Sequence, residues 1–279
     1  NVPETQVLAE PMGRNTAPAI AWAVSEMPAE VRQGVVAVLP ADHYVADEPA
    51  FRDVLQRAGE IAARDGCIMT LGVPPTRPET GYGYLELGEV LDTKSGLRKV
   101  ERFTEKPDPV TARDFFASGN YLWNAGIFVF PGEVLLSHIE ELQGAIHHGL
   151  TEARKQPHRL AEIYRELPSI SIDHAVMERL FDLGTLPLEC GWSDLGSWEA
   201  LSELLDADGD GNVVVGSALT IDSRDCLVYS DCGTTAVIGV EGLVIVQTSD
   251  AVLVVPKERS QEVRSIIDQL KDRDRDDLL

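Results

Sequence analysis

GVVAVLPADHYV, residues 34–45, is the stretch that decides the fold. Its apolar run, 35–39, predicts a strand buried on both faces, as in a parallel sheet. Pro40 ends the run, and Asp42 and His43 follow at once. In open α/β sheets, ligands bind in the crevice beyond the carboxyl ends of the strands. An acid in that place suits a hard cation, while a turn or a helix N-cap is the alternative.

Elements of alternating type surround this strand. A small apolar pattern predicts a helix over 15–27, and helical spacing predicts another over 51–62 that ends at Gly66. An apolar strand follows at 67–73, and the order strand, helix, strand predicts parallel neighbours in one sheet. The later predicted elements are, in order, antiparallel strands over 82–90 and 97–105, a helix over 109–118, a strand over 127–130, helices over 132–166 and 173–181, a strand over 185–190 and a helix in GSWEALSELL.

The pattern changes after residue 205. The loop DADGDGN is followed by many short β runs without helices between them, which predicts a β appendage built as a solenoid of short rungs. An amphipathic helix closes the chain. We therefore predict two domains, 1–207 and 208–279.

Composition limits the classes of function. The 279 residues are 44% hydrophobic, and 24 basic against 46 acidic side chains give a net charge of −22. So acidic a surface argues against a nucleic-acid partner, which needs clustered Lys and Arg. The four cysteines lack metal-ligand spacing and indicate reduced thiols of a cytoplasmic protein. No apolar run reaches membrane-spanning length, so no membrane partner is expected.

A second acid strengthens the hypothesis of a metal site. In ECGWSDLGSWEAL, Asp194 lies directly before a predicted helix, where an N-cap is the alternative and Ser193 and Ser197 compete for that position. One carboxylate does not usually hold Mg²⁺ against water, but two from distant segments can. Asp42 and Asp194 together therefore predict a Mg²⁺ site.

Polar side chains at further strand ends suit a phosphorylated sugar. In VERFTEKPDP, the Glu105 carboxylate can accept hydrogen bonds from sugar hydroxyls and the Lys106 ammonium can hold a phosphate. A surface ion pair is the alternative. In YLWNAGIFVF, Asn124 is a sugar-hydroxyl ligand or a strand-end cap. In TGYGYLELG, Gly83 beside Tyr82 allows a ligand to approach the backbone, or forms a plain turn.

The segment AEPMGRNTAPAI precedes the first predicted helix. An exposed helix N-terminus favours anions, and Arg14, Asn15 and Thr16 lie there. The Glu10 carboxylate can accept hydrogen bonds from the paired N–H donors of a guanine edge. A capping arrangement around Thr16 is the alternative.

One acidic loop imitates a calcium site. Asp206, Asp208, Asp210 and Gly211 match the start of a calcium-binding loop. Ser217 stands where the loop needs its bidentate Glu, and β runs follow instead of a helix. The loop is therefore predicted to be a turn-rich linker.

Seven ordered motifs together resemble the mannose-1-phosphate guanylyltransferases, also called GDP-mannose pyrophosphorylases. The resemblance runs from about residue 7 to residue 205, and the β appendage is similar to the family's C-terminal module. It implies an α/β fold: a Rossmann-like nucleotidyltransferase domain with a mixed, mostly parallel sheet, and a small module like a left-handed β-helix. The motifs are EPMGRNTAPAI, LPADHYV, RPETGYGYLELG, VERFTEKP, LWNAGIFVF, SIDHAVME and WSDLGSWEAL.

The resemblance implies transfer of GMP from GTP to mannose 1-phosphate, which gives GDP-mannose and pyrophosphate, with Mg²⁺ as cofactor. It leaves a homodimer open. Asp42, Lys106 and Asp194 would be the catalytic residues, with Mg²⁺ on the two aspartates and the sugar phosphate on Lys106. The implied substrate-binding residues are Glu105, Tyr82, Gly83 and Asn124 around mannose, and Glu10, Arg14, Asn15 and Thr16 near guanine.

The chain departs from the family at its start. The family begins with a strand and a Gly-rich loop, G-G-x-G-T-R-L-x-P-L-S, that cradles the triphosphate and supplies a catalytic arginine, and the 279 residues contain no such motif. We therefore expect the nucleotidyltransferase domain to be N-terminally incomplete here and transfer by this chain alone to be negligible. Two alternatives stay open: a nucleotidyltransferase for another sugar or base, and a non-catalytic sugar-nucleotide-binding or regulatory subunit.

Overall fold

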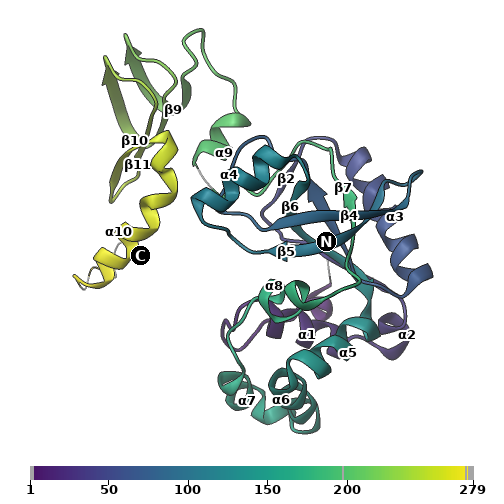
Figure 1. The fold of residues 1–279 in the computed structure, drawn as a ribbon. Coiled ribbons are helices and arrows are strands. Elements are labelled where there is room, and N and C mark those ends of the chain that lie inside the picture. Colours follow the sequence, from purple (N-terminus) through teal and green to yellow (C-terminus); the bar gives the residue numbers. More distant parts are fainter. Residues whose placement is uncertain (1–2, 197, 274, 276–279) are drawn as a thin grey trace. The chain divides into compact units, whose positions relative to one another are not determined.

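The computed structural model describes residues 3–196, 198–273 and 275 (Figure 1). By packing, the chain divides into two units, each with its own hydrophobic clusters. The first unit comprises Asn1–Ala41 and Val45–Trp192, and the second comprises Asp42–Tyr44 and Ser193–Leu279. The domain boundary predicted at residue 207 stays a prediction. Within the described residues, no helix is long and apolar enough to cross a membrane.

A six-stranded mixed sheet forms the framework of the first unit, with the strand order β1-β6-β3-β7-β5-β4. The predicted mixed sheet is confirmed, but its description as mostly parallel is wrong. Only β3 and β7 pair in parallel, while the pairs β1–β6, β3–β6, β4–β5, β4–β6 and β5–β7 are antiparallel. The strands are β1 (Val35–Val38), β3 (Met69–Val73), β4 (Tyr84–Asp92), β5 (Leu97–Thr104), β6 (Tyr121–Pro131) and β7 (Gly184–Pro187).

The reason for this difference is β6. The predicted parallel neighbours β1 and β3 do run in one direction, but β6 lies between them and is antiparallel to both. A short turn joins β4 to β5, and such a hairpin makes its strands antiparallel. Apolar runs identify strands without showing which strand lies beside which.

The first strand, β1, is not buried on both faces as predicted. Val36 is buried, but Val35 is 38% exposed and Leu39, just beyond the strand, is 43% exposed. Among the described strands β1 is the last in the sheet order and pairs only with β6. The side chains that alternate with Val36 therefore lie on a partly open face.

An opening along one edge of β6 positions the site. Phe128 pairs with both β1 and β3, and Trp123 pairs with both β3 and β4. Since a strand has two edges, β1 and β4 must share one of them and leave 124–127 between their ends. The carboxyl end of β1 faces this interval, because Val38 pairs with Phe128. This is the kind of place where ligands bind in α/β sheets.

Helices cover both faces of the sheet (Figure 1). Phe128 and Phe130 of β6 pack in the cluster of α1, α5, α6, α7 and α8, while Ile127 and Val129 point to α3 on the opposite face. This alternation follows from the two-residue period of a strand. The helices of the first unit are α1 (Thr16–Glu26), α2 (Ala29–Arg32), α3 (Glu48–Asp65), α4 (Pro109–Ser118), α5 (Gly132–Leu142), α6 (Gly144–Lys155), α7 (Leu160–Glu166) and α8 (Ile172–Ala175), with 3-10 turns at Glu4–Gln6, Pro157–Arg159 and Met177–Arg179.

The second unit contains a four-stranded sheet in the order β12-β11-β10-β9. Its strands β9 (Val213–Ile221), β10 (Leu227–Ile238) and β11 (Leu243–Gln247) stack in parallel, while β12 (Val252–Pro256) returns antiparallel to β11. The stacked parallel strands are the rungs predicted from the short β runs. The remaining elements are α9 (Trp198–Glu203), the 3-10 turn η4 (Lys257–Glu262), α10 (Val263–Lys271), and the paired short strands β2 (Tyr44–Val45) and β8 (Trp192–Ser193).

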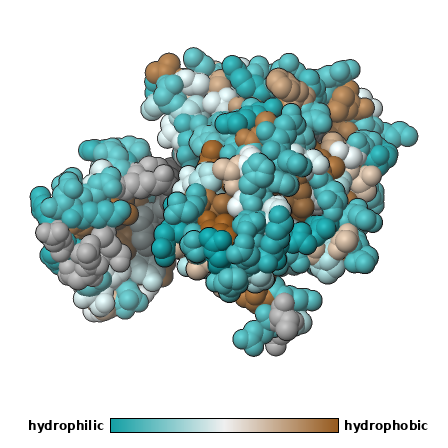
Figure 2. Space-filling view, turned by 90° about the horizontal axis from the view of Figure 1, so that it is seen from below, coloured by the Kyte–Doolittle hydropathy of each residue, from teal (hydrophilic) through white to brown (hydrophobic). Residues whose placement is uncertain are grey.

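The surface agrees with the net charge of −22. Figure 2 shows one face, on which hydrophilic residues predominate and hydrophobic ones lie scattered among them. Isolated apolar residues on a surface are common and need no special explanation.

Candidate active site

The two predicted metal ligands lie close to a common neighbour. Asp42 precedes β2, Asp194 follows β8, and β2 pairs with β8. Both carboxylates act electrostatically on the imidazole of His43. Burial lowers the pKa of His43 below its usual value, although both negative charges act in the opposite direction. The structure thus brings this aspartate pair, Asp42 and Asp194, within electrostatic reach of one half-buried histidine.

Backbone contacts within the first unit hold together the two segments that carry the aspartate pair. The amides of Ala46 and Asp47 both donate hydrogen bonds to the carbonyl oxygen of Cys190, at 3.1 and 2.9 Å. Gly191 has φ +64°, and a Cβ there would lie 2.7 Å from Cβ of Ala46. Glycine is therefore required for this close approach.

Helix capping does not explain either aspartate. The N-cap of α3 is Asp47, whose side chain accepts from the amide of Ala50. Asp194 Oδ1 accepts from the amide of Gly196 at 2.9 Å, which forms a local turn before α9. The competing cap Ser193 is used inside this turn, since its Oγ accepts from the amide of residue 195. Ser197, the other competitor, lies outside the described residues.

The donor set of the aspartate pair suits Mg²⁺. This ion prefers oxygen ligands and commonly takes one or two carboxylates together with substrate phosphates. Residues 3–196, 198–273 and 275 contain no cluster of three or more His, Cys, Asp or Glu side chains able to hold a metal. A site for Mg²⁺ on Asp42 and Asp194 would thus depend on further oxygens from a substrate.

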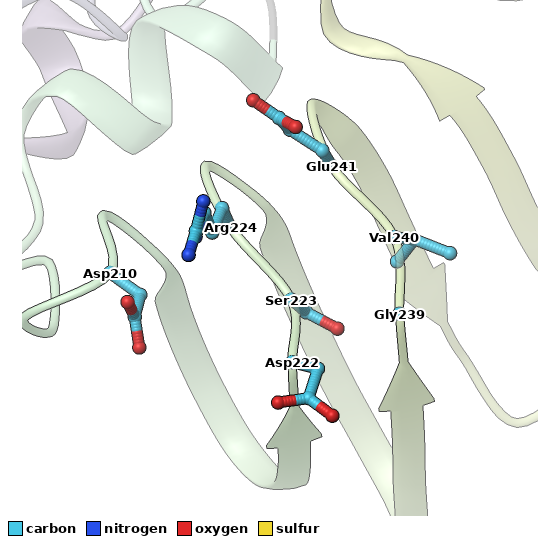
Figure 3. Close-up of a pocket in the computed structure, with 7 residues that line it drawn as sticks. All are labelled: Asp210, Asp222, Ser223, Arg224, Gly239, Val240 and Glu241. Carbon is cyan, nitrogen blue, oxygen red and sulfur yellow. The ribbon is translucent and has the colours of Figure 1, made fainter.

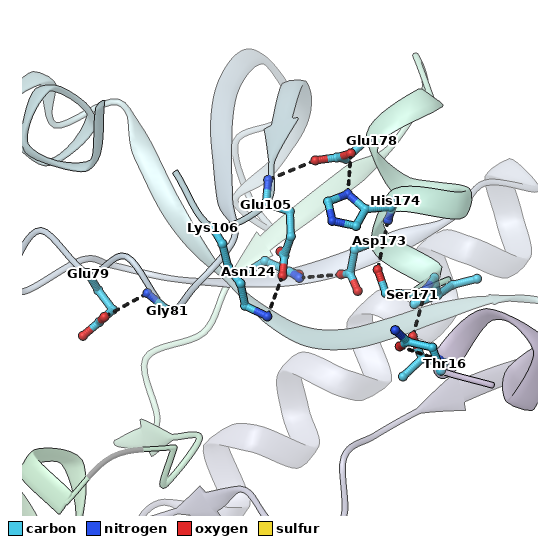
Figure 4. A network of polar contacts seen from close by, with 12 residues as sticks. Thr16, Glu79, Gly81, Glu105, Lys106, Asn124, Ser171, Asp173, His174 and Glu178 are labelled. Carbon is cyan, nitrogen blue, oxygen red and sulfur yellow. Dashed lines mark hydrogen bonds and ion pairs between the residues drawn. The ribbon is translucent and has the colours of Figure 1, made fainter. Parts of the chain in front are cut away.

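Glu105 and Lys106 form an ion pair, but Glu105 is not a surface residue. Lys106 Nζ lies 3.2 Å from Glu105 Oε1, and their side chains are 52% and 13% exposed (Figure 4). The backbone of Lys106 has φ +46°, in the left-handed region that non-glycine residues rarely adopt. Strain of this kind costs about 1–3 kcal/mol and gathers at functional sites. The predicted alternative of an ordinary surface pair does not fit the burial of Glu105.

A protein side chain approaches the backbone closely at Gly83, while the predicted approach of a ligand there stays a prediction. A Cβ on Gly83 would lie 2.6 Å from Glu105 Oε2 and 3.2 Å from the ring of Phe103. The carbonyl oxygen of Gly83 accepts from the amide of Asn124 at 2.8 Å. The absent side chain of Gly83 therefore allows the Glu105 carboxylate to reach the opening along β6.

Asn124 is buried, and its amide group is fully oriented. Its Oδ1 accepts from Thr70 Oγ1 at 2.9 Å, and its Nδ2 donates to Asp173 Oδ1 at 3.2 Å (Figure 4). It lies inside β6, so the predicted alternative of a strand-end cap is wrong. A buried amide must pair its polar atoms, and here three separate segments meet to do so.

Asp173 is a further candidate site residue that sequence reasoning did not single out. Burial, with a smaller contribution from the negative charge of Glu105, raises the pKa of Asp173 to about 6. Lys106 and His174 act in the opposite direction. The motif SIDHAVME contains this residue, and Ser171 caps the start of its short helix by accepting from the His174 amide. We call Glu105, Lys106, Asn124 and Asp173 the sugar-side cluster.

Aromatic rings surround Tyr82, beside Gly83. The Tyr82 ring meets those of Trp123 and Trp192 edge to face, with centroids 5.1 and 5.7 Å apart. The Arg77 guanidinium lies 5.8 Å from the centroid of the Trp123 ring. Such contacts fix the Tyr82 ring, which stays a predicted sugar-binding residue.

The N-terminal residues predicted near guanine bond to the protein itself. Glu10 accepts from the Tyr164 hydroxyl, and burial together with this hydrogen bond raises the pKa of Tyr164 above its usual value. Arg14 donates to the carbonyl of Arg165. Their role beside a guanine stays a prediction.

The alternative predicted for this segment, a helix-capping arrangement around Thr16, is confirmed, although Thr16 itself is not the N-cap residue. The N-cap of α1 is Asn15, at φ 65°, and its side chain accepts from the Thr16 amide. Thr16 Oγ1 accepts from the amide of Ile172 at 2.8 Å (Figure 4). The Ala17 amide donates to the Ile170 carbonyl. The start of α1 therefore holds the segment that carries Asp173.

The acidic loop beyond α9 forms turns, as predicted. Asp208 Oδ1 accepts from the amides of Asp210 and Asn212, at 3.0 and 2.8 Å. Asp210 also lines a polar hollow of about 250 Å³ at the end of the rungs, together with Asp222, Arg224 and Glu241 (Figure 3). None of the predicted site residues lines this hollow.

Comparison with known families agrees with the two-part architecture. A family model described as "Nucleotidyl transferase" matches residues 2–210. A second model, described as "MannoseP isomerase/GMP-like beta-helix domain", matches residues 216–270. The two matches confirm the predicted fold class of a nucleotidyltransferase domain followed by a β-helix-like module.

Curated relatives match almost the whole chain. A protein of Escherichia coli named mannose-1-phosphate guanylyltransferase is 40% identical over 282 residues, which cover 97% of this chain and 59% of that protein. The xanthan biosynthesis protein XanB of Xanthomonas campestris is 40% identical over 97% of this chain and 58% of its own length. The alginate biosynthesis protein AlgA of Pseudomonas aeruginosa is 36% identical over 97% and 57%. The chain thus spans under three fifths of the length of these relatives.

Solved structures share the fold. One from Thermus thermophilus, described as mannose-1-phosphate geranyltransferase, superposes with a TM-score of 0.82 at 37% identity, over 95% of this chain and 77% of the other. One from Helicobacter pylori, described as mannose-6-phosphate isomerase, gives a TM-score of 0.57 at 28% identity, over 66% and 72%. These likenesses agree with the resemblance indicated by the seven motifs.

Proposed function

Since the chain belongs to the nucleotidyl transferase family, we propose that this protein transfers GMP from GTP to mannose 1-phosphate. The products are GDP-mannose and pyrophosphate. The observation that carries the proposal is the sugar-side cluster, where a carboxylate and an amide suited to hydroxyl groups lie beside an ammonium suited to a phosphate. Relatives named for this activity support it.

In this proposal, different residues of the sugar-side cluster bind different groups of mannose 1-phosphate. Glu105 accepts hydrogen bonds from mannose hydroxyls, and Asn124 contributes its remaining amide hydrogen or carbonyl lone pair. Lys106, whose side chain is 52% exposed, swings its ammonium to the sugar phosphate. Tyr82 and Gly83 line the sugar, and Glu10, Arg14, Asn15 and Thr16 belong to the guanine end.

The chemistry is a displacement at phosphorus. A phosphate oxygen of mannose 1-phosphate attacks the α-phosphorus of GTP, and the bond to the β-phosphate oxygen breaks to release pyrophosphate. Such reactions depend on positioning and on neutralising charge, with little covalent work for the protein. Lys106 contributes to both the positioning and the charge neutralisation by holding the attacking phosphate.

We further propose that the aspartate pair holds Mg²⁺. When bound, this ion would reduce the repulsion between the two anionic substrates and stabilise the departing pyrophosphate. Beside these carboxylates the chain places His43, whose pKa is lowered by burial, so that its imidazole is mostly neutral at pH 7. A neutral imidazole does not compete with a cation for them.

We propose the cytoplasm as the location, because all four cysteines are free thiols and disulfides are rare there. A homodimer stays an expectation from the resemblance.

The test is product formation by the full-length gene product, with Mg²⁺, mannose 1-phosphate and each of GTP, ATP, UTP and dTTP. The proposal expects GDP-mannose from GTP at a kcat/KM at least about tenfold above the other nucleotides. Equal rates with all four would remove the guanine assignment. Calorimetric binding of GDP-mannose without any turnover would favour the non-catalytic subunit instead.

A further inference from the structure

Asp173 has no role in the reaction as described so far, yet its carboxylate lies at the centre of the sugar-side cluster. It comes from α8, a four-residue helix held in place by the bond from the Ile172 amide to Thr16 Oγ1. It reaches the middle of β6 and accepts a hydrogen bond from Asn124 Nδ2. A polar contact between segments 49 residues apart, at a place where ligands are expected, calls for an explanation.

The hydrogen bonds of Asn124 show what Asp173 does. An amide side chain can turn by 180° about its last bond, which exchanges its donor and its acceptor. Thr70 Oγ1 bonds to Asn124 Oδ1 on one side, but a hydroxyl can donate or accept and so permits either orientation. An ionised carboxylate only accepts, so Asp173 requires the NH₂ group of Asn124 to face it. This fixes which atoms remain for a ligand.

Charge gives Asp173 a second effect. Glu105 and Asp173 are two carboxylates near one ammonium, that of Lys106, and both Glu105 and Lys106 act on Asp173 electrostatically. His174, the next residue of α8, also acts on Asp173 electrostatically, and Glu178 accepts from both the His174 ring and the Glu105 amide. Lys106 is thus drawn into the cluster by two negative charges when Asp173 is ionised and by one when it is protonated.

We propose that Asp173 is the positioning residue that orients the Asn124 amide and holds Lys106 for the sugar 1-phosphate. The inference rests on the proposed function, because it assigns the acceptor substrate to this cluster. Asp173 itself need not touch the substrate. It acts through Asn124 and Lys106.

The position of Asp173 also predicts an unusual stability effect. Its pKa is about 6 in the folded protein against 3.8 for the ordinary side chain. A carboxyl with a raised pKa loses stability as pH rises through the interval between the two values. The ionised form is therefore unfavourable above pH 6, and replacing it by a neutral group should stabilise the fold. A residue kept for structure alone would show the opposite.

The experiment compares Asp173→Asn, Asp173→Ala and wild type in the full-length gene product. Asp173→Ala should raise KM for mannose 1-phosphate about tenfold or more and leave KM for GTP within about twofold. Asp173→Asn keeps an acceptor for Asn124, so its KM should lie closer to wild type. Its Tm at pH 8 should rise by about 2–4 °C. Asp53→Asn, an exposed acid on α3, is the matched control and should change neither quantity.

The pH profile separates positioning from simple packing. In wild type, kcat/KM for mannose 1-phosphate should fall as pH drops through about 6, partly from the substrate phosphate and partly from Asp173. In Asp173→Asn only the decrease caused by protonation of the substrate phosphate remains. The ratio of kcat/KM in wild type to kcat/KM in the variant should therefore decrease toward low pH. An unchanged KM in Asp173→Ala, or a constant ratio, would overturn the inference. If wild type forms no GDP-mannose, the proposed function itself has failed.

Discussion

The sugar-side cluster and the aspartate pair are both groups of acids, yet they are built in opposite ways. In the sugar-side cluster each carboxylate has a protein partner: Lys106 for Glu105, and the Asn124 amide for Asp173. The aspartate pair acts electrostatically on His43, whose pKa burial lowers so that the ring is mostly neutral near pH 7. Polar groups that already have hydrogen-bond or ion-pair partners, as in the sugar-side cluster, suit a ligand with hydroxyl groups. Two carboxylates beside a neutral imidazole, as in the aspartate pair, suit a cation.

The contrast teaches that the number of acids does not define a site. The loop around Asp208 has more acids than either cluster, but Asp208 Oδ1 accepts from two nearby backbone amides. That arrangement is a local turn. What distinguishes the two candidate sites is convergence from segments far apart in sequence.

The largest expected effect comes from the aspartate pair. In the full-length gene product, Asp42→Asn or Asp194→Asn should lower kcat by about 10²–10⁴-fold, because the lost charge weakens binding of the cation. Thermal unfolding should show an intact fold. Near-normal rates in both variants would refute the assignment of the metal to this pair.

The next effect tests the sugar-side cluster. Glu105→Gln should raise KM for mannose 1-phosphate by about 10–100-fold, since a charged hydrogen-bond acceptor contributes about 1.5–3 kcal/mol. KM for GTP should stay within about twofold. Glu101→Gln, on the same strand with a side chain 60% exposed, is the control. Equal increases in KM for mannose 1-phosphate and for GTP would show that Glu105 does not act specifically on the sugar substrate.

A smaller effect is expected from Gly83→Ala. The added methyl would lie 2.6 Å from Glu105 Oε2 and must displace that carboxylate. We expect a loss of about 1–3 kcal/mol in the free energy of unfolding, together with a higher KM for mannose 1-phosphate. Gly209→Ala is the control, because a Cβ there meets nothing within 4 Å. Identical Tm values for the two variants would contradict the close packing at Gly83.

The smallest effect concerns His174 and Glu178. The ring lies 2.9 Å from the Glu178 carboxylate, which raises the pKa of His174 above 6.5. The resulting stability is fully present below pH 6.5 and is lost as pH rises through the folded-state pKa. Because the pair is exposed, we expect only about 0.3–0.5 kcal/mol. Glu178→Gln should remove this part of the difference in Tm between about pH 5.5 and 8, and an unchanged difference would contradict it.

The sequence indicated the elements better than their pairing. The helices α1 and α3 and the hairpin β4–β5 lie where periodicity and glycines predicted them. The neighbours in the sheet were not predictable, since β6 inserts between β1 and β3 by long-range pairing. For the same reason, the exposure of Val35 could not be read from a run of apolar residues.

The site was predictable where a residue type matches one chemistry. Glu105, Lys106 and Asn124 are predicted sugar and phosphate ligands, and the structure brings them together around Asp173, while their ligand roles stay predictions. Asp173 was not predicted as a site residue, because its hydrogen-bond partner Asn124 lies 49 residues away in the sequence. Thr16 was assigned to a ligand, but its hydroxyl accepts a backbone hydrogen bond that only the folded chain reveals.

The most direct test is a crystal structure of the full-length gene product with GDP-mannose and Mn²⁺, which substitutes for Mg²⁺ and can be located by its anomalous signal. The account predicts one Mn²⁺ peak within coordination distance of the Asp42 and Asp194 carboxylates, and mannose hydroxyls within hydrogen-bonding distance of Glu105 and Asn124. A metal bound elsewhere, or a mannose that touches neither residue, would contradict it.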